Sequence, residues 1–266
     1  MELTAENYYS KEANLEYMSV SQFKDFVGTA GVRGCEAKAM AKLRGEWCEE
    51  PSEAMLVGSY VDAHVEGTLD AFKTKYHGQV YGAKGKTYVW VDKAENMIRR
   101  FERDPLFKMI LTGEKQRIMT AELFGAKWKI KLDVLGVDFV CDLKTTAEIS
   151  KSFWHADTGR LSIIDEWGYD VQGAIYPEVV RINQNAEKRL PMYFAIVSRE
   201  KFPDICVVQL DDFKIRDALA NVEKCMPNIL RVKAGELEPT RCETCDYCKS
   251  TRVLTKPIWA SELVQK

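Results

Sequence analysis

Apolar and polar residues alternate along residues 127–135 and 139–144, which predicts two β-strands joined by a tight turn at 136–138. The apolar side chains of the first strand share one face, and they are Trp128, Ile130, Leu132 and Val134. The opposite face carries Lys129, Lys131, Asp133 and Leu135. In the second strand Val140, Asp142 and Lys144 share a face, and Cys141 points away from them and should be buried.

Two acids and a lysine can therefore meet on one side of this hairpin. Paired carboxylates bind hard divalent cations such as Mg²⁺ or Mn²⁺, and a nearby ammonium can stabilise a developing oxyanion or orient a water molecule. The same alternation also fits an exposed amphipathic hairpin with scattered surface charge. Motifs in the rest of the chain distinguish the metal-binding interpretation from the surface-hairpin interpretation.

Helical periodicity and capping residues predict the other elements. We expect helices at 19–27, 35–43, 53–69, 92–111, 165–182 and 211–233. We expect further strands at 117–124, 192–197 and 205–210, and loosely held residues at 1–17. This order, with a three-stranded meander and two later strands among helices, is typical of an α/β (or α+β) sandwich with a mixed central sheet.

The composition is that of a globular protein with a sizeable core: 266 residues, of which 46% are hydrophobic and 29% are charged. No apolar run approaches the roughly 20 residues that span a bilayer, and the N-terminus is not a signal segment, so a cytoplasmic protein without a membrane partner is expected. The net charge of −2 means that a nucleic-acid surface would have to be a local basic patch.

The spacing of the hairpin acids resembles a known catalytic core. Asp133, eight intervening residues and then Asp142-x-Lys144 resemble the D…(D/E)xK core of the PD-(D/E)xK nuclease superfamily. Leu132 stands where the superfamily name has proline.

Two flanking helices extend the resemblance. Upstream, Gly58-x₅-His64-x-Glu66 is similar to the Gly…His…Glu helix of RecB-type nucleases, and downstream Gln172-x₃-Tyr176 is similar to their Q-x₃-Y motif. The order of the motifs also agrees. The resemblance covers roughly residues 19–250 and is closest to RecE-like phage exonucleases of the exonuclease VIII type.

The resemblance implies a single nuclease domain over 1–266 with a restriction-endonuclease-like core at 53–234. N-terminal helices at 19–52 precede this core, and a cysteine-containing segment at 235–266 follows it. The implied ligands of one or two Mg²⁺ or Mn²⁺ ions are His64, Asp133, Asp142 and the backbone carbonyl of Leu143.

The resemblance also assigns roles to the other motif residues. Lys144 would position the attacking water and neutralise charge on the scissile phosphate. Gln172 and Tyr176 would support the site or contact the DNA backbone. Lys129 and Lys131 lie on the Asp133 face of the predicted strand and become candidates for DNA binding.

The implied activity is metal-dependent exonucleolytic degradation of linear double-stranded DNA from its ends. RecE-like enzymes leave 3′ single strands for a RecT-like annealing recombinase, act as ring-like homo-oligomers, and are encoded by phages or prophages in the bacterial cytoplasm. Two alternatives share the motifs: a CRISPR-adaptation-like iron–sulfur nuclease, and an inactive DNA-binding scaffold.

The cysteines form a second candidate site. Cys242-x₂-Cys245-x₂-Cys248 offers three thiolates at metal-ligand spacing. Cys35 resembles the N-terminal cysteine of iron–sulfur nucleases of the helicase–nuclease and CRISPR-adaptation type, and would supply the fourth ligand. A [4Fe–4S] cluster, a structural Zn²⁺ ion and four reduced cysteines remain as alternatives.

Overall fold

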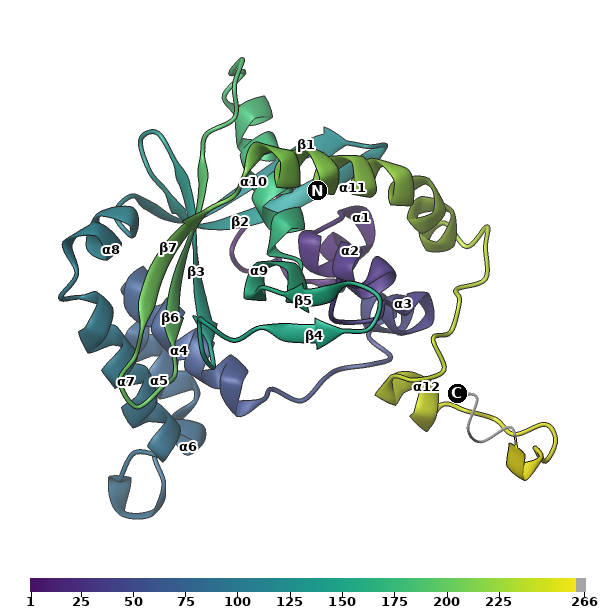
Figure 1. The fold of residues 1–266 in the computed structure, drawn as a ribbon, viewed down its shortest axis with the longest axis horizontal. Helices are drawn as coiled ribbons and strands as arrows, with labels where there is room; N and C mark the ends of the chain where they lie inside the picture. The colour runs from purple at the N-terminus through teal and green to yellow at the C-terminus, as the bar shows by residue number, and fades with distance from the viewer. Residues whose placement is uncertain (262–266) are drawn as a thin grey trace.

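The computed structural model describes residues 1–261 and is built around a five-stranded mixed sheet (Figure 1). Its strands are β1 (Glu114–Leu123), β2 (Ala126–Leu135), β3 (Val140–Thr146), β6 (Met192–Ser198) and β7 (Ile205–Gln209). They lie in the order β1-β2-β3-β6-β7, with β3 and β6 parallel and the other neighbours antiparallel. The predicted meander and the predicted mixed sheet are both confirmed.

Helices cover both faces of the sheet, so the predicted α/β sandwich is confirmed. One face packs against α2 (Val20–Val27), α10 (Tyr169–Asn183) and α11 (Asp212–Lys233). The other packs against α4 (Glu53–Glu66), α7 (Val89–Phe101) and α8 (Pro105–Ile110). The smaller elements are α1 (Lys11–Glu16), α3 (Glu36–Arg44), α5 (Leu69–Lys75), α6 (His77–Val80), η1 (Ala83–Gly85), β4 (Phe153–His155), β5 (Gly159–Leu161), α9 (Ile163–Glu166) and α12 (Asp246–Ser250).

Strand β2 contributes to both cores. Trp128 and Leu132 belong to the core under α2, α10 and α11, whereas Val134 belongs to the core under α4, α7 and α8. All three are fully buried and lie on the same alternating face. The strand therefore twists along its length, which turns the face bearing Asp133 toward the space between the two cores.

Strands β2 and β3 separate after only two residue pairs, Val134 with Cys141 and Leu135 with Val140. Beyond this fork the N-terminal segment takes the place beside β2: the Met18 N–H donates to the Lys127 carbonyl at 2.7 Å, and the Met18 carbonyl accepts from the Lys129 N–H at 2.8 Å. The fork leaves an opening between β2 and β3.

The expectation that residues 1–17 are loosely held is wrong. This segment contains α1, and the side chains of Tyr8, Ala13 and Tyr17 are buried. No long apolar stretch signals this in the sequence. The segment is held instead by its backbone pairing with β2 and by a buried lysine described below.

Other boundaries shift for local reasons. The helix predicted at 92–111 starts earlier, at Val89, and is divided by a turn before Pro105, which begins α8. The loop after β3 contains the β4–β5 hairpin, and the helix predicted at 165–182 is divided at Gly168, which has a φ of 59°. Cys141 is fully buried, as predicted.

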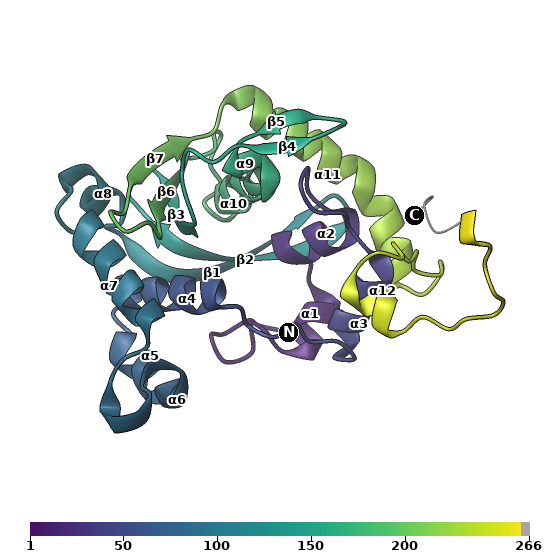
Figure 2. The same ribbon diagram turned by 60° about the horizontal axis from the view of Figure 1, so that its bottom comes forward.

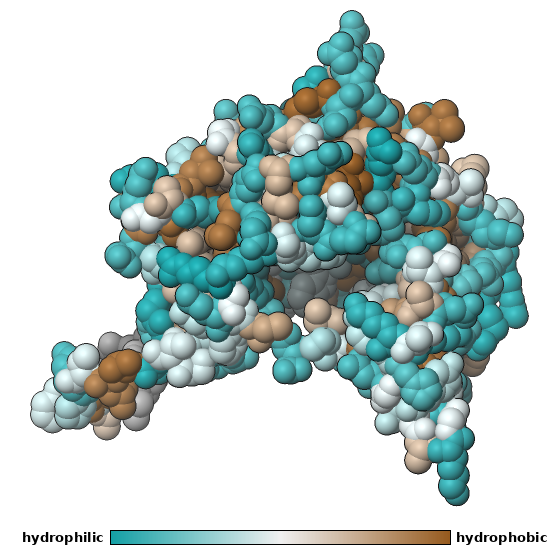
Figure 3. Space-filling model, turned by 180° about the vertical axis from the view of Figure 1, so that it is seen from behind, coloured by the Kyte–Doolittle hydropathy of each residue, from teal (hydrophilic) through white to brown (hydrophobic). Residues whose placement is uncertain are grey.

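The surface seen from behind is mostly hydrophilic and is hollowed near its centre (Figure 3). Helices α5 and α6 project from the body at one side, and the segment containing α12 lies at the other (Figure 2). No helix within residues 1–261 is both long and apolar enough to cross a membrane.

Candidate active site

The fork between β2 and β3 positions the two acids of the predicted core. Asp133 precedes Val134 and Asp142 follows Cys141, so both acids lie next to the last residue pair, at the point where the strands part. The Leu143 backbone N–H donates to Asp133 Oδ2 at 3.0 Å, so the Asp133 carboxylate bridges the fork. The fork thus holds both carboxyl groups at its opening.

Asp142 is the most constrained side chain of the site, with 3% of its surface exposed. Its carboxylate forms an ion pair with the Lys144 ammonium and accepts a hydrogen bond from Gln172 Nε2. The Lys144 ammonium also lies 4.9 Å from the centre of the Tyr169 ring. Burial acts to lower the pKa of Lys144, but the Asp142 carboxylate outweighs it, so the pKa is raised and the lysine stays charged.

A third acid, Asp62 on α4, faces the same opening. Burial and the negative charge of Asp142 raise the pKa of Asp62 to about 7. Burial, Asp142 and Asp62 raise the pKa of Asp133 well above its ordinary value. Asp133 and Asp62 therefore resist ionisation beside the Asp142 carboxylate, although the Lys144 ammonium acts in the opposite direction on both.

These residues fit a hard divalent cation. Their donors are all oxygen atoms, which suit Mg²⁺ and Mn²⁺ and not soft metals. A bound dication would also stabilise the ionised carboxylates that otherwise repel one another. Asp62, Asp133, Asp142 and the Leu143 carbonyl are the groups that could hold it.

Helix α4 presents Asp62 to this site in place of His64. Gly58, Asp62 and Glu66 are spaced by four residues and so share one helical face. A Cβ on Gly58 would lie 3.3 Å from Thr145 Oγ1, so this face packs directly on β3.

His64 projects from α4 in a different direction from Asp62. Its Nε2 lies 2.8 Å from a carboxylate oxygen of Glu102, just beyond the end of α7, and its side chain is absent from the cavity wall described next. The predicted grouping of His64 with Asp133 and Asp142 is therefore not what the structure contains. The helical spacing from Gly58 could have identified Asp62, whereas the motif resemblance drew attention to the histidine.

A cavity of about 450 Å³ opens over the fork. Its wall includes all three acids, Lys144, Gln172 and Tyr176, so the structure brings together every predicted core residue except His64. Gln172 and Tyr176 project together from α10, as their spacing predicts. Burial raises the pKa of Tyr176 well above its ordinary value, which keeps its hydroxyl neutral.

Lys129 and Lys131 differ in depth. Lys129 is 1% exposed, and its ammonium donates to the Tyr8 carbonyl at 2.5 Å and to Asn14 Oδ1 at 2.7 Å. Burial lowers the pKa of Lys129 to about 8. The expectation that Lys129 lies on an open DNA-contacting face is wrong, because the N-terminal segment covers it. Both lysines line the cavity, but Lys131 is partly exposed, and its ammonium lies 5.2 Å from the centre of the Tyr9 ring.

Lys24 on α2 is a cavity residue that sequence reasoning missed. Its ammonium donates to the Trp167 carbonyl at 3.1 Å, and burial together with the positive charge of Lys144 lowers its pKa to about 8. A single lysine on a short amphipathic helix gives no sequence signal. Its position follows from the packing of α2 beside α10.

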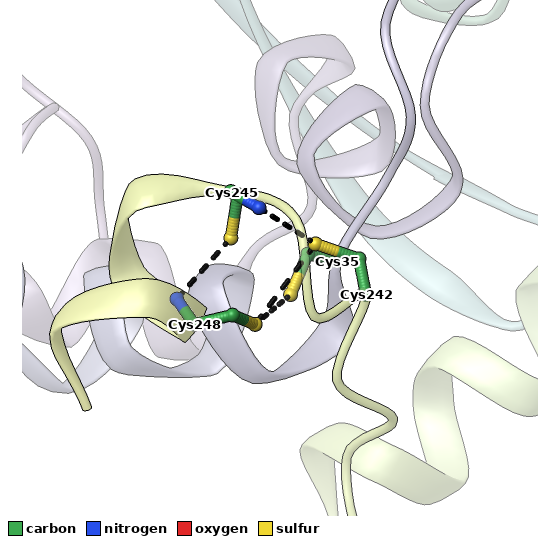
Figure 4. A group of neighbouring side chains, drawn as sticks. All are labelled: Cys35, Cys242, Cys245 and Cys248. Atoms are coloured by element: carbon green, nitrogen blue, oxygen red, sulfur yellow. Dashed lines mark hydrogen bonds between the residues drawn. The ribbon is translucent and has the colours of Figure 1, made fainter. Parts of the chain in front are cut away.

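The four cysteines of the second predicted site also come together (Figure 4). The sulfur atoms of Cys35, Cys242, Cys245 and Cys248 all lie within 4.8 Å of one another. Cys35 begins α3, whereas the other three precede or belong to α12. Two segments more than 200 residues apart therefore meet at one thiol cluster.

A mixed sheet flanked by helices, with D…DxK residues at a strand fork and a Q-x₃-Y helix beside them, defines a PD-(D/E)xK nuclease fold. The chain belongs to the family described as "PDDEXK-like domain of unknown function (DUF3799)", whose family model matches residues 19–251. The superfamily predicted from the motifs is thus confirmed.

Among solved structures the chain is similar to a crystal structure described as a "putative exonuclease" from Eubacterium rectale. The two share 49% sequence identity, and the match covers 99% of this chain and 98% of that one, with a TM-score of 0.94. No curated protein matches the chain.

Proposed function

We propose that this protein is a metal-dependent DNA exonuclease. The observation that carries the proposal is the buried Asp142 carboxylate, paired with Lys144 and Gln172 and crowded by Asp133 and Asp62 at the fork. The raised pKa values of Asp133 and Asp62 show that ionisation of these two groups is unfavourable here, and a bound cation would stabilise their charged forms. A hard dication beside a charged lysine can activate a water molecule and stabilise the negative charge that develops during phosphodiester hydrolysis.

Asp62, Asp133, Asp142 and the Leu143 carbonyl would hold Mg²⁺ or Mn²⁺. A bound dication supplies an activated water and neutralises charge on the scissile phosphate. Lys144 keeps its proton because of Asp142, so its ammonium can donate to a phosphate oxygen as negative charge develops there. Gln172 fixes the Asp142 carboxylate in place by its hydrogen bond.

Of the other lysines in the cavity wall, we assign Lys131 and Lys24 to the DNA backbone. Both can approach a phosphate, and neither contact would distinguish one base from another. The activity is therefore expected to be independent of sequence.

The exonuclease activity, and its substrate, product and partner, are proposed from similarity to other proteins in addition to the cavity. The E. rectale neighbour is described as an exonuclease. The motif order resembles RecE-like enzymes, which supports double-stranded ends as substrate, 3′ single strands as product, a homo-oligomer and a RecT-like annealing partner in a phage-infected bacterium. The CRISPR-adaptation-like alternative predicts instead a preference for short single-stranded or branched DNA.

The test compares linear duplex with covalently closed circular DNA, both with Mg²⁺ and with EDTA. We expect nucleotide release from the linear form alone, and only with the metal. Lys144→Ala should slow release by about 10²–10³-fold, the usual cost of removing one group that stabilises transition-state charge. Separate 5′ and 3′ labels report which strand is degraded.

His64→Gln is the matched control, because it changes a metal-binding residue type on α4, the helix of Asp62, but outside the cavity. It should retain nearly full activity. Full activity of both Asp142→Asn and Lys144→Ala would show that the site is assigned wrongly. Cleavage of closed circles at the same rate as linear DNA would exclude an exonuclease.

A further inference from the structure

The four-cysteine cluster joins the segment containing α12 to the start of α3, and the proposed nuclease chemistry does not involve it. Cys35 Sγ lies 3.5 Å from Cys248 Sγ, which lies 3.9 Å from Cys242 Sγ. Cys35, Cys242 and Cys248 are buried, and Cys245 is partly exposed. The four side chains point toward a common centre (Figure 4).

Backbone amides hold three of these sulfur atoms in position. Cys35 Sγ accepts from the Lys38 N–H at 3.4 Å, Cys242 Sγ accepts from the Cys245 N–H at 3.3 Å, and Cys245 Sγ accepts from the Cys248 N–H at 3.5 Å. Such N–H donors favour thiolates over thiols. The spacing of the sulfurs is therefore set by the folded backbone of α3 and α12.

This spacing matches a single tetrahedral ion. Zinc–sulfur bonds of about 2.3 Å in a tetrahedron place neighbouring thiolates about 3.8 Å apart. A four-iron cubane separates its cysteine sulfurs by a layer of irons and sulfides, and so requires a larger cage than one whose sulfurs all lie within 4.8 Å. The [4Fe–4S] cluster that the nuclease resemblance implied does not fit these residues.

We propose that Cys35, Cys242, Cys245 and Cys248 form a structural Zn²⁺ site that fastens the C-terminal segment onto α3. A closed four-thiolate site has no open position for substrate or water, so its role is to hold structure. Hydrogen bonds beside the cluster also connect α3 to the C-terminal part of the chain. Glu36 of α3 accepts from the Thr240 N–H at 2.8 Å and from Asn228 Nδ2 at 2.6 Å.

The consequence reaches the catalytic cavity through α3. Ala39, Lys42 and Leu43 of α3 line that cavity beside Lys24 and Asp25 of α2. The Lys42 ammonium lies 2.9 Å from the Asp25 carboxylate, which links the two helices. The zinc site therefore anchors the helix pair that forms one wall of the cavity.

The test is the metal content of the full-length protein, purified anaerobically from cells supplied with both iron and zinc. We expect one zinc per chain and no acid-labile sulfide. Because zinc can displace iron during expression, metal-free protein is also incubated anaerobically with iron and sulfide, and separately with Co²⁺. Cobalt should give the intense visible bands of a tetrahedral thiolate site.

Cys245→Ser should lose the zinc and show faster amide hydrogen exchange in α3 and 236–251. Cys225→Ser on α11 is the matched control and should keep both the zinc and the protection. A stable reconstituted cluster with about four irons and four sulfides per chain would overturn the proposal. So would wild-type protein that binds neither zinc nor cobalt. Neither result depends on whether the protein cleaves DNA.

Discussion

Replacing Asp62 by asparagine should stabilise the protein without a divalent metal, and a divalent metal should cancel most of this gain. The pKa of Asp62 rises from 3.8 to about 7 because its carboxyl is buried beside Asp142. A shift of roughly three units corresponds to about 4 kcal/mol when the group is ionised. Asp62 retains some exposure to solvent, which screens this cost, so we expect Asp62→Asn to raise the free energy of unfolding by about 1–2 kcal/mol at pH 8 in EDTA.

The pH dependence has a defined sign. The folded protein holds the Asp62 proton more tightly than the unfolded chain does, so this group destabilises the fold progressively as pH rises from about 4 to about 7. Above about pH 7 the penalty is constant. The gain from Asp62→Asn should therefore be largest at pH 8 and about half as large near pH 5.5.

Magnesium should stabilise the wild type more than Asp62→Asn, by about 1.3 kcal/mol, and so bring the stabilities of the two proteins close together. At 100 times its dissociation constant, a metal that binds only the folded state stabilises it by about 2.7 kcal/mol. If the loss of one carboxylate weakens binding about tenfold, the same concentration stabilises Asp62→Asn by only about 1.4 kcal/mol.

Urea unfolding at pH 5.5 and pH 8, with EDTA and with Mg²⁺, measures all of these quantities. Asp70→Asn, an exposed acid on the neighbouring helix α5, is the control and should respond to Mg²⁺ as the wild type does. If Asp62→Asn destabilises the protein equally in EDTA and in Mg²⁺, Asp62 is a structural residue and the electrostatic account of the fork is refuted.

Three further substitutions test the roles that the structure indicates for His64, Lys131 and Lys129. His64→Gln should change stability by at most about 1 kcal/mol and leave the Mg²⁺ concentration needed for nuclease activity unchanged; a requirement for tenfold more Mg²⁺ would restore His64 as a ligand. Lys131→Ala should reduce the slope of log affinity against log salt by about 1 for duplex DNA, measured by fluorescence anisotropy in Ca²⁺; an unchanged slope would remove Lys131 from the DNA surface. Lys129→Ala should leave that slope unchanged but lower the free energy of unfolding by about 2 kcal/mol in urea, because the Tyr8 carbonyl and Asn14 lose their buried donor; unchanged stability would contradict its role as a buried anchor.

Local periodicity was enough to predict the central elements of this fold. The alternation around Ile130 and Leu143 predicted β2 and β3, and the spacing of Gln172 and Tyr176 predicted their common face on α10. These features depend on residues two to four positions apart. The covered sheet follows because apolar faces at those periods must be buried.

The fork itself could not be predicted from the sequence, because the hairpin pattern continues past the point where the strands part. The separation depends on Met18, which pairs with β2 from more than 100 residues away. That contact also buries Lys129, whose ammonium is held by Tyr8 and Asn14, while Lys131, two residues further on the same face, stays partly exposed. Strand alternation gives the direction of a side chain, but its depth is decided by the segment that covers it.

The same long-range contact explains why the acids meet where they do. In a regular antiparallel ladder Asp133 and Asp142 would be directly opposite neighbours at the usual strand spacing, and the ladder would continue past them. Because β3 pairs with β6 while the N-terminal segment takes its place beside β2, the strands are pulled apart at these two residues. The Leu143 N–H then turns to the Asp133 carboxylate, and α4 can bring Asp62 to the opening because Gly58 allows it to pack on β3. The interruption of the ladder therefore creates the site. A variant that loosens residues 8–18 should impair metal binding although it changes none of the three carboxylates at the fork.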